Sequence, residues 1–198
     1  MPGNYQVRLT SEGKSQTVPL ELKLDPRVNV SMADLEKQFD LDMKIRSQLS
    51  ELHQTVEQIR SIRQQFHTLN ARLGEDARFK PISTASDSLD KKMTPIEEQL
   101  LQVKIKSSEA SLNYPVLIDE QLHTLAILVD NADAPPTSQQ EAAFESLKSQ
   151  SAPLIAQWKQ IESTDVVALN DMMQKQNVPA IYLAPASGQG EVKAAGQN

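Results

Sequence analysis

Cysteine is absent from the 198 residues, and aromatic residues make up only 4% of them. The first absence excludes disulfides, thiolate metal sites and a cysteine nucleophile, although it leaves the cellular compartment open. The second means that Leu, Ile, Val, Met and Ala must fill any core, which suits packed helices better than a β-sandwich. A chain of this length can bury such a core.

Long apolar runs and basic clusters are also lacking. The longest apolar run, residues 125–129, is far shorter than the ~20 residues of a membrane span. Twenty Lys and Arg residues against 26 Asp and Glu residues give a net charge of −6. We therefore expect no nucleic acid partner and no membrane span. Residues 1–4 have neither the basic nor the apolar stretch of a signal peptide, so the localisation is unknown.

Two alternating stretches open the chain and predict a β-hairpin. Apolar and polar residues alternate before and after Gly13, a residue that suits the positive φ of a tight turn. Two strands alone are marginal in water, and Pro19 indicates an edge strand. The apolar face therefore needs a partner. Its expected members are Tyr5, Val7, Leu9, Val18, Leu20, Leu22 and Leu24.

After Pro26 the pattern becomes helical. Ser31 is a typical N-cap and Gly74 a typical helix end, which predicts one helix of roughly 43 residues. The step from Ile59 to Ile62 is one residue short of the 4-3 pattern and indicates local overwinding. The apolar stripe comprises Leu35, Phe39, Ile45, Leu49, Leu52, Val56, Ile59, Ile62, Phe66, Leu69 and Leu73, and we expect Leu49, Leu52, Val56 and Ile59 to be buried.

Three shorter helical patterns follow an expected loop at residues 75–86. The first leaves two interpretations open, because Thr94 and Pro95 form a start signal: the helix begins near Pro95, or an earlier turn joins it with a kink. The second has its apolar face between Ile118 and Val129. The third starts at a predicted capping box and is expected to be interrupted at residues 163–165 before a last helical segment. Its expected apolar face is Phe144, Leu147, Leu154, Trp158 and Ile161.

The predicted fold is mainly α: an antiparallel bundle of about four helices, the first very long, with an N-terminal β-hairpin. An extended coiled-coil hairpin is the competing interpretation, since 4-3 spacing fits both. We expect three parts, namely a hairpin at residues 1–26, a helical bundle at 27–178 and a flexible tail at 179–198.

Titratable residues form no recognisable catalytic, cofactor or metal site, so we expect no enzyme. His53 and Glu57 have the i, i+4 spacing of some metal sites, but His53 and His67 flank the apolar stripe and nothing ties His123 to them. Asp40 with Asp42, and Asp130 with Asp133, lack the other oxygen ligands of a calcium loop. Glu97 and Glu98 are interpreted as first-turn charges, and Trp158 as a core residue.

One segment carries a resemblance to a known family. Residues 2–28, PGNYQVRLTSEGKSQTVPLELKLDPRV, resemble the closing strands of an Ig-like β-domain in large bacterial proteins built on sortilin-like, BNR-repeat β-propellers, often described as glycosyl hydrolases. A long helical region follows in those proteins, and residues 39–65, 113–125 and 133–161 look similar to it. The resemblance implies that this chain is the C-terminal part of a larger protein, periplasmic or extracellular. It assigns no catalytic residue, because the propeller lies outside the chain.

The sequence thus favours a non-enzymatic structural or interaction module whose partner is the propeller and Ig-like part of that larger protein. Two alternatives stay open. One is an accessory region of an exported glycosyl hydrolase-like enzyme, and the other is a self-associating coiled-coil adaptor.

Overall fold

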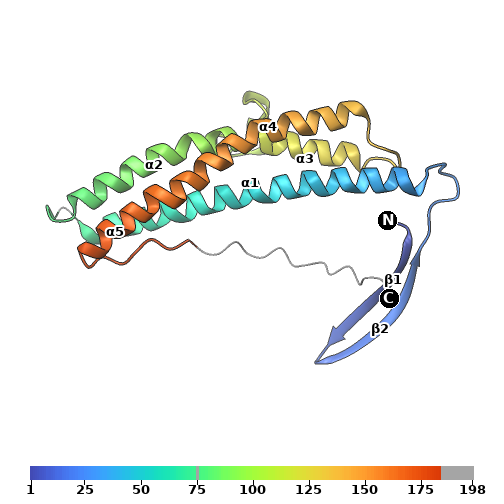
Figure 1. Ribbon diagram of the computed structural model, residues 1–198, viewed down its shortest axis with the longest axis horizontal. Helices are drawn as coiled ribbons and strands as arrows, with labels where there is room; N and C mark the ends of the chain where they lie inside the picture. The colour runs from blue at the N-terminus through green and yellow to red at the C-terminus, as the bar shows by residue number, and fades with distance from the viewer. Residues whose placement is uncertain (75, 184–198) are drawn as a thin grey trace.

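The computed structural model describes residues 1–74 and 76–183 of the chain. Figure 1 shows an elongated helical bundle with a β-hairpin projecting from one end, which confirms the predicted fold class. The elements are β1 (Gly3–Ser11), β2 (Lys14–Leu22), α1 (Met32–Leu73), α2 (Lys80–Leu100), the 3₁₀ segment η1 (Ser108–Asn113), α3 (Ile118–Val129), α4 (Ser138–Ile161), the π-helical turn η2 (Glu162–Val166) and α5 (Val167–Lys175).

The helices form three rods side by side. α1 runs the length of the bundle, α2 and then α3 follow it in the opposite direction, and α4, η2 and α5 form a rod parallel to α1 (Figure 1). Polar contacts fix this order. Gln38 of α1 donates a 2.7 Å hydrogen bond to the Val129 carbonyl of α3, and Arg63 of α1 lies 2.7 Å from Asp90 of α2. The second rod therefore consists of two helices, α2 and α3, placed end to end along α1.

The predicted ends of α1 are confirmed. The Ser31 hydroxyl accepts a hydrogen bond from the Asp34 N–H, and Gly74 has a φ of 60° while its N–H donates to the Asn70 carbonyl. The helix spans 42 residues. At 1.5 Å per residue this is about 63 Å, far longer than any other helix of the described chain.

The predicted short step in the stripe lies where α1 changes its neighbour. Ile59 and Ile62 are both fully buried. Before them His53 contacts Asp119 of α3, and at Arg60 the contacts with Glu97 of α2 begin. A stripe that must face two successive helices has a physical reason to shift its register at this point.

Three apolar residues expected in the α1 stripe are not fully buried. One of them, Leu73 in the last turn, is half-buried against the core. Phe39 is exposed and Leu49 is half-buried, while the neighbouring Gln38 and Gln48 are buried. The two glutamines can be buried because their amides are hydrogen-bonded: Gln38 donates to two carbonyls near the end of α3, and Gln48 donates to Ser151 at 3.1 Å. A prediction from apolar residues alone therefore placed the stripe one residue too far along the chain at Phe39 and at Leu49.

The expected loop at residues 75–86 is too long, since α2 begins at Lys80. Pro81 lies in the first helical turn, where a missing N–H has no intrahelical partner to lose. The second helix also does not begin near Pro95. It passes through Pro95, whose side chain is exposed, and the Thr94 hydroxyl donates to the Asp90 carbonyl one turn earlier.

The third rod is continuous where an interruption was expected. Buried residues step from Ile161 to Val166, a spacing of five that an α-helix cannot keep on one face, and the π-helical turn η2 accommodates the additional residue. Trp158 is buried as predicted, and its indole N–H donates to Gln58 at 2.9 Å. Ile155, and not the predicted Leu154, occupies the preceding core position.

The chain after α5 lies against the bundle as far as the described residues extend. Val178 and Ile181 belong to the hydrophobic core. The tail predicted from residue 179 thus begins with five described residues, 179–183, and its remainder lies outside the described residues.

Leu52 tests the core directly, because its side chain is fully buried in the α1 stripe. Leu52→Ala is expected to lower the free energy of unfolding by about 2–5 kcal/mol through lost burial and a residual cavity. Leu112→Ala is the matched control, since Leu112 is 84% exposed. Urea unfolding followed by circular dichroism measures both, and equal effects would contradict the assignment of the core.

Candidate functional site

The three histidines do not converge. The His53 side chain on α1 lies 2.6 Å from the Asp119 carboxylate on α3. Its partner is therefore on another helix, and is not Glu57 on α1. His67 lies further along α1 and His123 lies on α3, each exposed. Within residues 1–74 and 76–183, no group of three or more His, Asp or Glu side chains is arranged to hold a metal ion.

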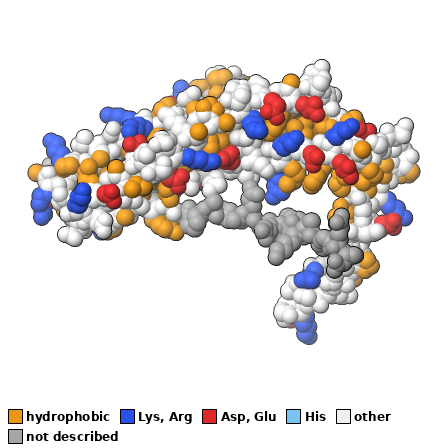
Figure 2. Space-filling model, in the orientation of Figure 1, with side chains coloured by type: hydrophobic (Ala, Val, Ile, Leu, Met, Phe, Trp, Pro, Cys, Tyr) orange, Lys and Arg blue, Asp and Glu red, His pale blue; other side chains and the backbone are white. Residues whose placement is uncertain are grey.

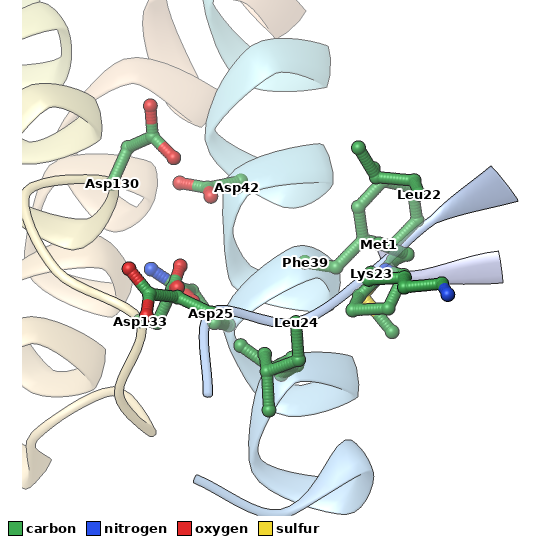
Figure 3. A pocket seen from close by; sticks show the side chains of 12 residues that line it. Met1, Leu22, Lys23, Leu24, Asp25, Phe39, Asp42, Asp130 and Asp133 are labelled. Carbon is green, nitrogen blue, oxygen red and sulfur yellow. The ribbon is translucent and has the colours of Figure 1, made fainter. Parts of the chain in front are cut away.

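An acidic hollow lies at the junction of hairpin and bundle, and sequence reasoning missed it. It has a volume of about 250 Å³, and its lining includes Asp25, Asp42, Asp130 and Asp133. Figure 3 shows the Asp42 and Asp130 side chains pointing toward one another from α1 and the end of α3. These carboxylates come together because the start of α1 meets the end of the antiparallel α3. Only knowledge of that pairing could have predicted the cluster.

In the hollow, the carboxylates of Asp42 and Asp130 repel one another. Burial, followed by the neighbouring Asp130 carboxylate, raises the pKa of Asp42 above its ordinary value. Asp25, in contrast, is engaged by Arg27, whose hydrogen bonds lower the pKa of Asp25. The hollow can attract a proton or a cation, but the described side chains around it assemble neither a metal site nor a nucleophile with its base.

An ion-pair network centred on the buried Glu97 joins α1 to α2. The two carboxylate oxygens of Glu97 lie 2.6 Å from Arg60 and 2.6 Å from Arg63, and Arg63 also reaches Asp90. Glu97 is only 5% exposed and lies in the last turn of α2, so its interpretation as a first-turn charge is wrong. Burial, the largest single effect, would raise the pKa of Glu97, but the hydrogen bonds from Arg63 and Arg60 outweigh it and hold the pKa below its usual value.

The hairpin has a defined register. Glu12 and Gly13 form its two-residue turn with φ values of 50° and 76°, as in the type I′ turns that match strand twist. Ser11 and Lys14 flank this turn and form the first hydrogen-bonded pair, after which hydrogen-bonded and non-hydrogen-bonded pairs alternate. The hydrogen-bonded pairs are therefore Leu9 with Gln16, Val7 with Val18, Tyr5 with Leu20 and Gly3 with Leu22.

One face of the hairpin is apolar and uncovered. Its side chains are between 45% and 69% exposed, and neither strand packs extensively on a described helix. Together they expose on the order of 500 Å² of mainly apolar surface, comparable with the largest patch on a typical monomer. Leu24, expected on this face, lies beyond β2 at the acidic hollow. The members of the apolar hairpin face are Tyr5, Val7, Leu9, Val18, Leu20 and Leu22.

The two edges of the hairpin are not equivalent. Gln6 lies opposite Pro19 and Arg8 opposite Thr17, in pairs whose backbone groups point outward. Pro19 has no N–H, so the outer edge of β2 lacks a donor at its centre, while β1 presents the N–H groups of Gln6 and Arg8 without interruption. In the described chain no third strand pairs with either edge. β1 is the edge that can accept another strand.

Outside the hairpin, the described surface also has a hollow of about 450 Å³ between α3 and α4, with a lining that includes Leu125, Leu128 and Leu147. Acidic and basic side chains are interspersed over the bundle face seen in Figure 2, and no continuous basic stripe crosses it. Among the helices of the described residues, none combines the length and apolarity needed to cross a bilayer. The uncovered hairpin is the strongest candidate for a functional surface.

In comparisons with known proteins, no family model, curated protein or solved structure matched the chain.

Glu97 provides a test of the network with a matched control beside it. Glu97→Gln is expected to cost roughly 1–3 kcal/mol near pH 7, because it leaves two arginines without their carboxylate. Glu98→Gln, at the exposed neighbouring position, should change stability by less than about 0.5 kcal/mol. Denaturant unfolding of both variants measures the difference.

The pH dependence of this difference has a defined sign. A lowered pKa in the folded state means that the unfolded chain binds more protons in acid, so stability from Glu97 rises with pH. The cost of Glu97→Gln should be complete above about pH 5 and decrease as the pH falls below the ordinary glutamate pKa of about 4.3. A cost that is the same at pH 3 and pH 7 would contradict the role of the ion pairs.

Proposed function

We propose that this chain is a non-enzymatic interaction module in which the hairpin docks and the helical bundle supports it. The apolar hairpin face carries the proposal. Six apolar side chains are exposed together on a two-stranded ribbon, whereas the apolar stripes of the helices are buried. Two strands alone are only marginally stable in water, so a ribbon with this face gains stability when a partner covers it.

The proposed occupant is the open sheet of a β-domain. Such a sheet offers both a strand that can hydrogen-bond to the outer edge of β1 and an apolar layer that can cover the hairpin face. In that arrangement β2 becomes the edge strand of the completed sheet, and Pro19 is positioned where an edge strand tolerates proline and discourages further pairing. The chemistry of both edges and of the face fits this partner.

The resemblance of residues 2–28 to the closing strands of an Ig-like domain supports the same occupant. On this proposal the chain is the C-terminal part of a larger sortilin-like β-propeller protein, and the hairpin completes the Ig-like domain of that protein. Whether such a parent protein also acts on glycans, with this chain as its accessory region, would depend on residues outside the chain.

Self-association is the second candidate function, because every copy of the chain exposes the same apolar hairpin face. Two copies stacked face to face would bury on the order of 1,000 Å², which is near the lower limit for a specific interface. The core residues of the helical bundle pack against one another within the chain, so they are not available to such a dimer. The two candidates therefore use the same surface and differ in the occupant.

The coding sequence directly upstream of this chain tests the first candidate. We expect it to encode an incomplete β-domain that, as a separately expressed chain, binds residues 1–198 in isothermal titration calorimetry. Arg8→Pro should abolish binding by removing a donor from the β1 edge, whereas Thr17→Pro, at the opposite position on β2, should retain it within about threefold. Neither substitution removes a hydrogen bond within the hairpin, because both N–H groups point outward.

Light scattering on the purified chain separates the alternatives. A dimer that Leu20→Asp converts to a monomer, without a change in the melting temperature of the helices, would favour self-association. If the chain is monomeric and the upstream sequence encodes no β-domain, the docking proposal is wrong.

A further inference from the structure

The segment after α5 is held in a way that differs from ordinary helix packing. Asn177 has a φ of 56° and reverses the chain at the end of α5, where the Val178 N–H donates to the Met173 carbonyl at 2.9 Å. The segment then runs back along the bundle below α1, as an extended chain, through the last described residues (Figure 1).

Two side-chain amides form paired hydrogen bonds with the backbone of this segment. Asn170 of α5 donates to the Ile181 carbonyl at 3.1 Å and accepts from the Ile181 N–H at 2.7 Å. Gln65 of α1 makes the same pair of bonds with Tyr182, at 2.7 Å to the carbonyl and 2.9 Å from the N–H. Each amide thus replaces a neighbouring β-strand for one residue.

This geometry selects an extended backbone. The N–H and C=O of one residue in an extended chain point to the same side, and those of the next residue point to the opposite side. Asn170 and Gln65 therefore hold the two edges of the segment from two different helices. Neither amide bonds to a side chain of the segment, so these four bonds carry no sequence preference of their own.

Sequence preference comes from two apolar anchors. Val178 and Ile181, three residues apart, are each only 7% exposed, whereas the residues between them, Pro179 and Ala180, are exposed. Tyr182 is 66% exposed although its backbone is held. A hollow of about 210 Å³ lies beside the segment against α1. The pattern is that of a peptide anchored at two positions, with space left next to it.

We propose that α1 and α5 form a peptide clamp, defined by Gln65, Asn170 and the surface beneath Val178 and Ile181, which binds extended peptides with apolar residues at positions i and i+3. The chain's own residues 178–182 occupy the clamp in cis. A tethered occupant has an effective concentration in the millimolar range, so the clamp is closed to weaker competitors until the segment leaves. This binding site is independent of the hairpin and goes beyond the proposed function.

The test uses a variant in which the segment leaves the clamp, and adds the same segment as a separate peptide. The full-length variant Val178→Asp/Ile181→Asp loses both anchors while every helix keeps its sequence. The probe is a fluorescein-labelled peptide with the sequence NVPAIYL, residues 177–183, followed by fluorescence polarisation. We expect saturable binding to the released variant and at least tenfold weaker binding to the unmodified chain.

Matched controls identify the clamp. Adding Gln65→Leu and Asn170→Leu to the released variant should weaken peptide binding at least tenfold, while Gln174→Leu, at an exposed position of α5, should not. A peptide with Asp in place of both anchors should not bind. Circular dichroism confirms that each variant keeps its helices.

Three results would overturn the proposal. The first is a folded, released variant that does not bind the peptide. The second is binding that is unchanged by loss of both amides. The third is unfolding of the released variant, which would make residues 178–182 an obligatory part of the fold and not an exchangeable occupant.

Discussion

Burial of the α1 stripe is the constraint on which the rest of the molecule depends. An isolated helix has little stability of its own in water, and most helical stability in proteins comes from packing an apolar face. The α1 stripe extends from Leu35 to Leu69, longer than either α2 or α3 can cover. Two helices in succession therefore cover it on one side. α4 packs against it on the other side, and α5, which continues the rod of α4 and η2, packs against α2. The π-helical turn keeps that rod in register over the full length.

The burial of apolar side chains also distinguishes the segment after α5 from the N-terminal hairpin. At the C-terminal side, Val178 and Ile181 find a partner surface, and the amides of Gln65 and Asn170 satisfy the backbone between two helices. At the N-terminal side, no described helix covers the apolar hairpin face to a comparable extent. One segment is thus completed within the chain, whereas the other has the chemistry of a surface that is completed by a partner.

The sequence predicted the elements better than their neighbours. Alternation and capping signals are local, so the hairpin turn, the ends of α1 and the bounds of α3 could be predicted from them. Gln38 and Gln48 could not be placed in the core, because their burial depends on acceptors roughly ninety residues or more away in the chain. The pairing of Asp42 with Asp130, and the grip of Gln65 on the returning segment, depend on tertiary proximity in the same way. Periodicity carries no information about such distant partners.

We infer that α1 and its covering helices form one cooperative unit, to whose stability the hairpin adds little. Hydrogen exchange of the full chain, followed by mass spectrometry, measures this most directly. Amides at the centre of α1 are expected to exchange only through global unfolding, with an opening free energy equal to the free energy of unfolding measured in urea. Amides of residues 3–22 are expected to exchange orders of magnitude faster. Hairpin amides protected as strongly as those around Leu52 would contradict the account.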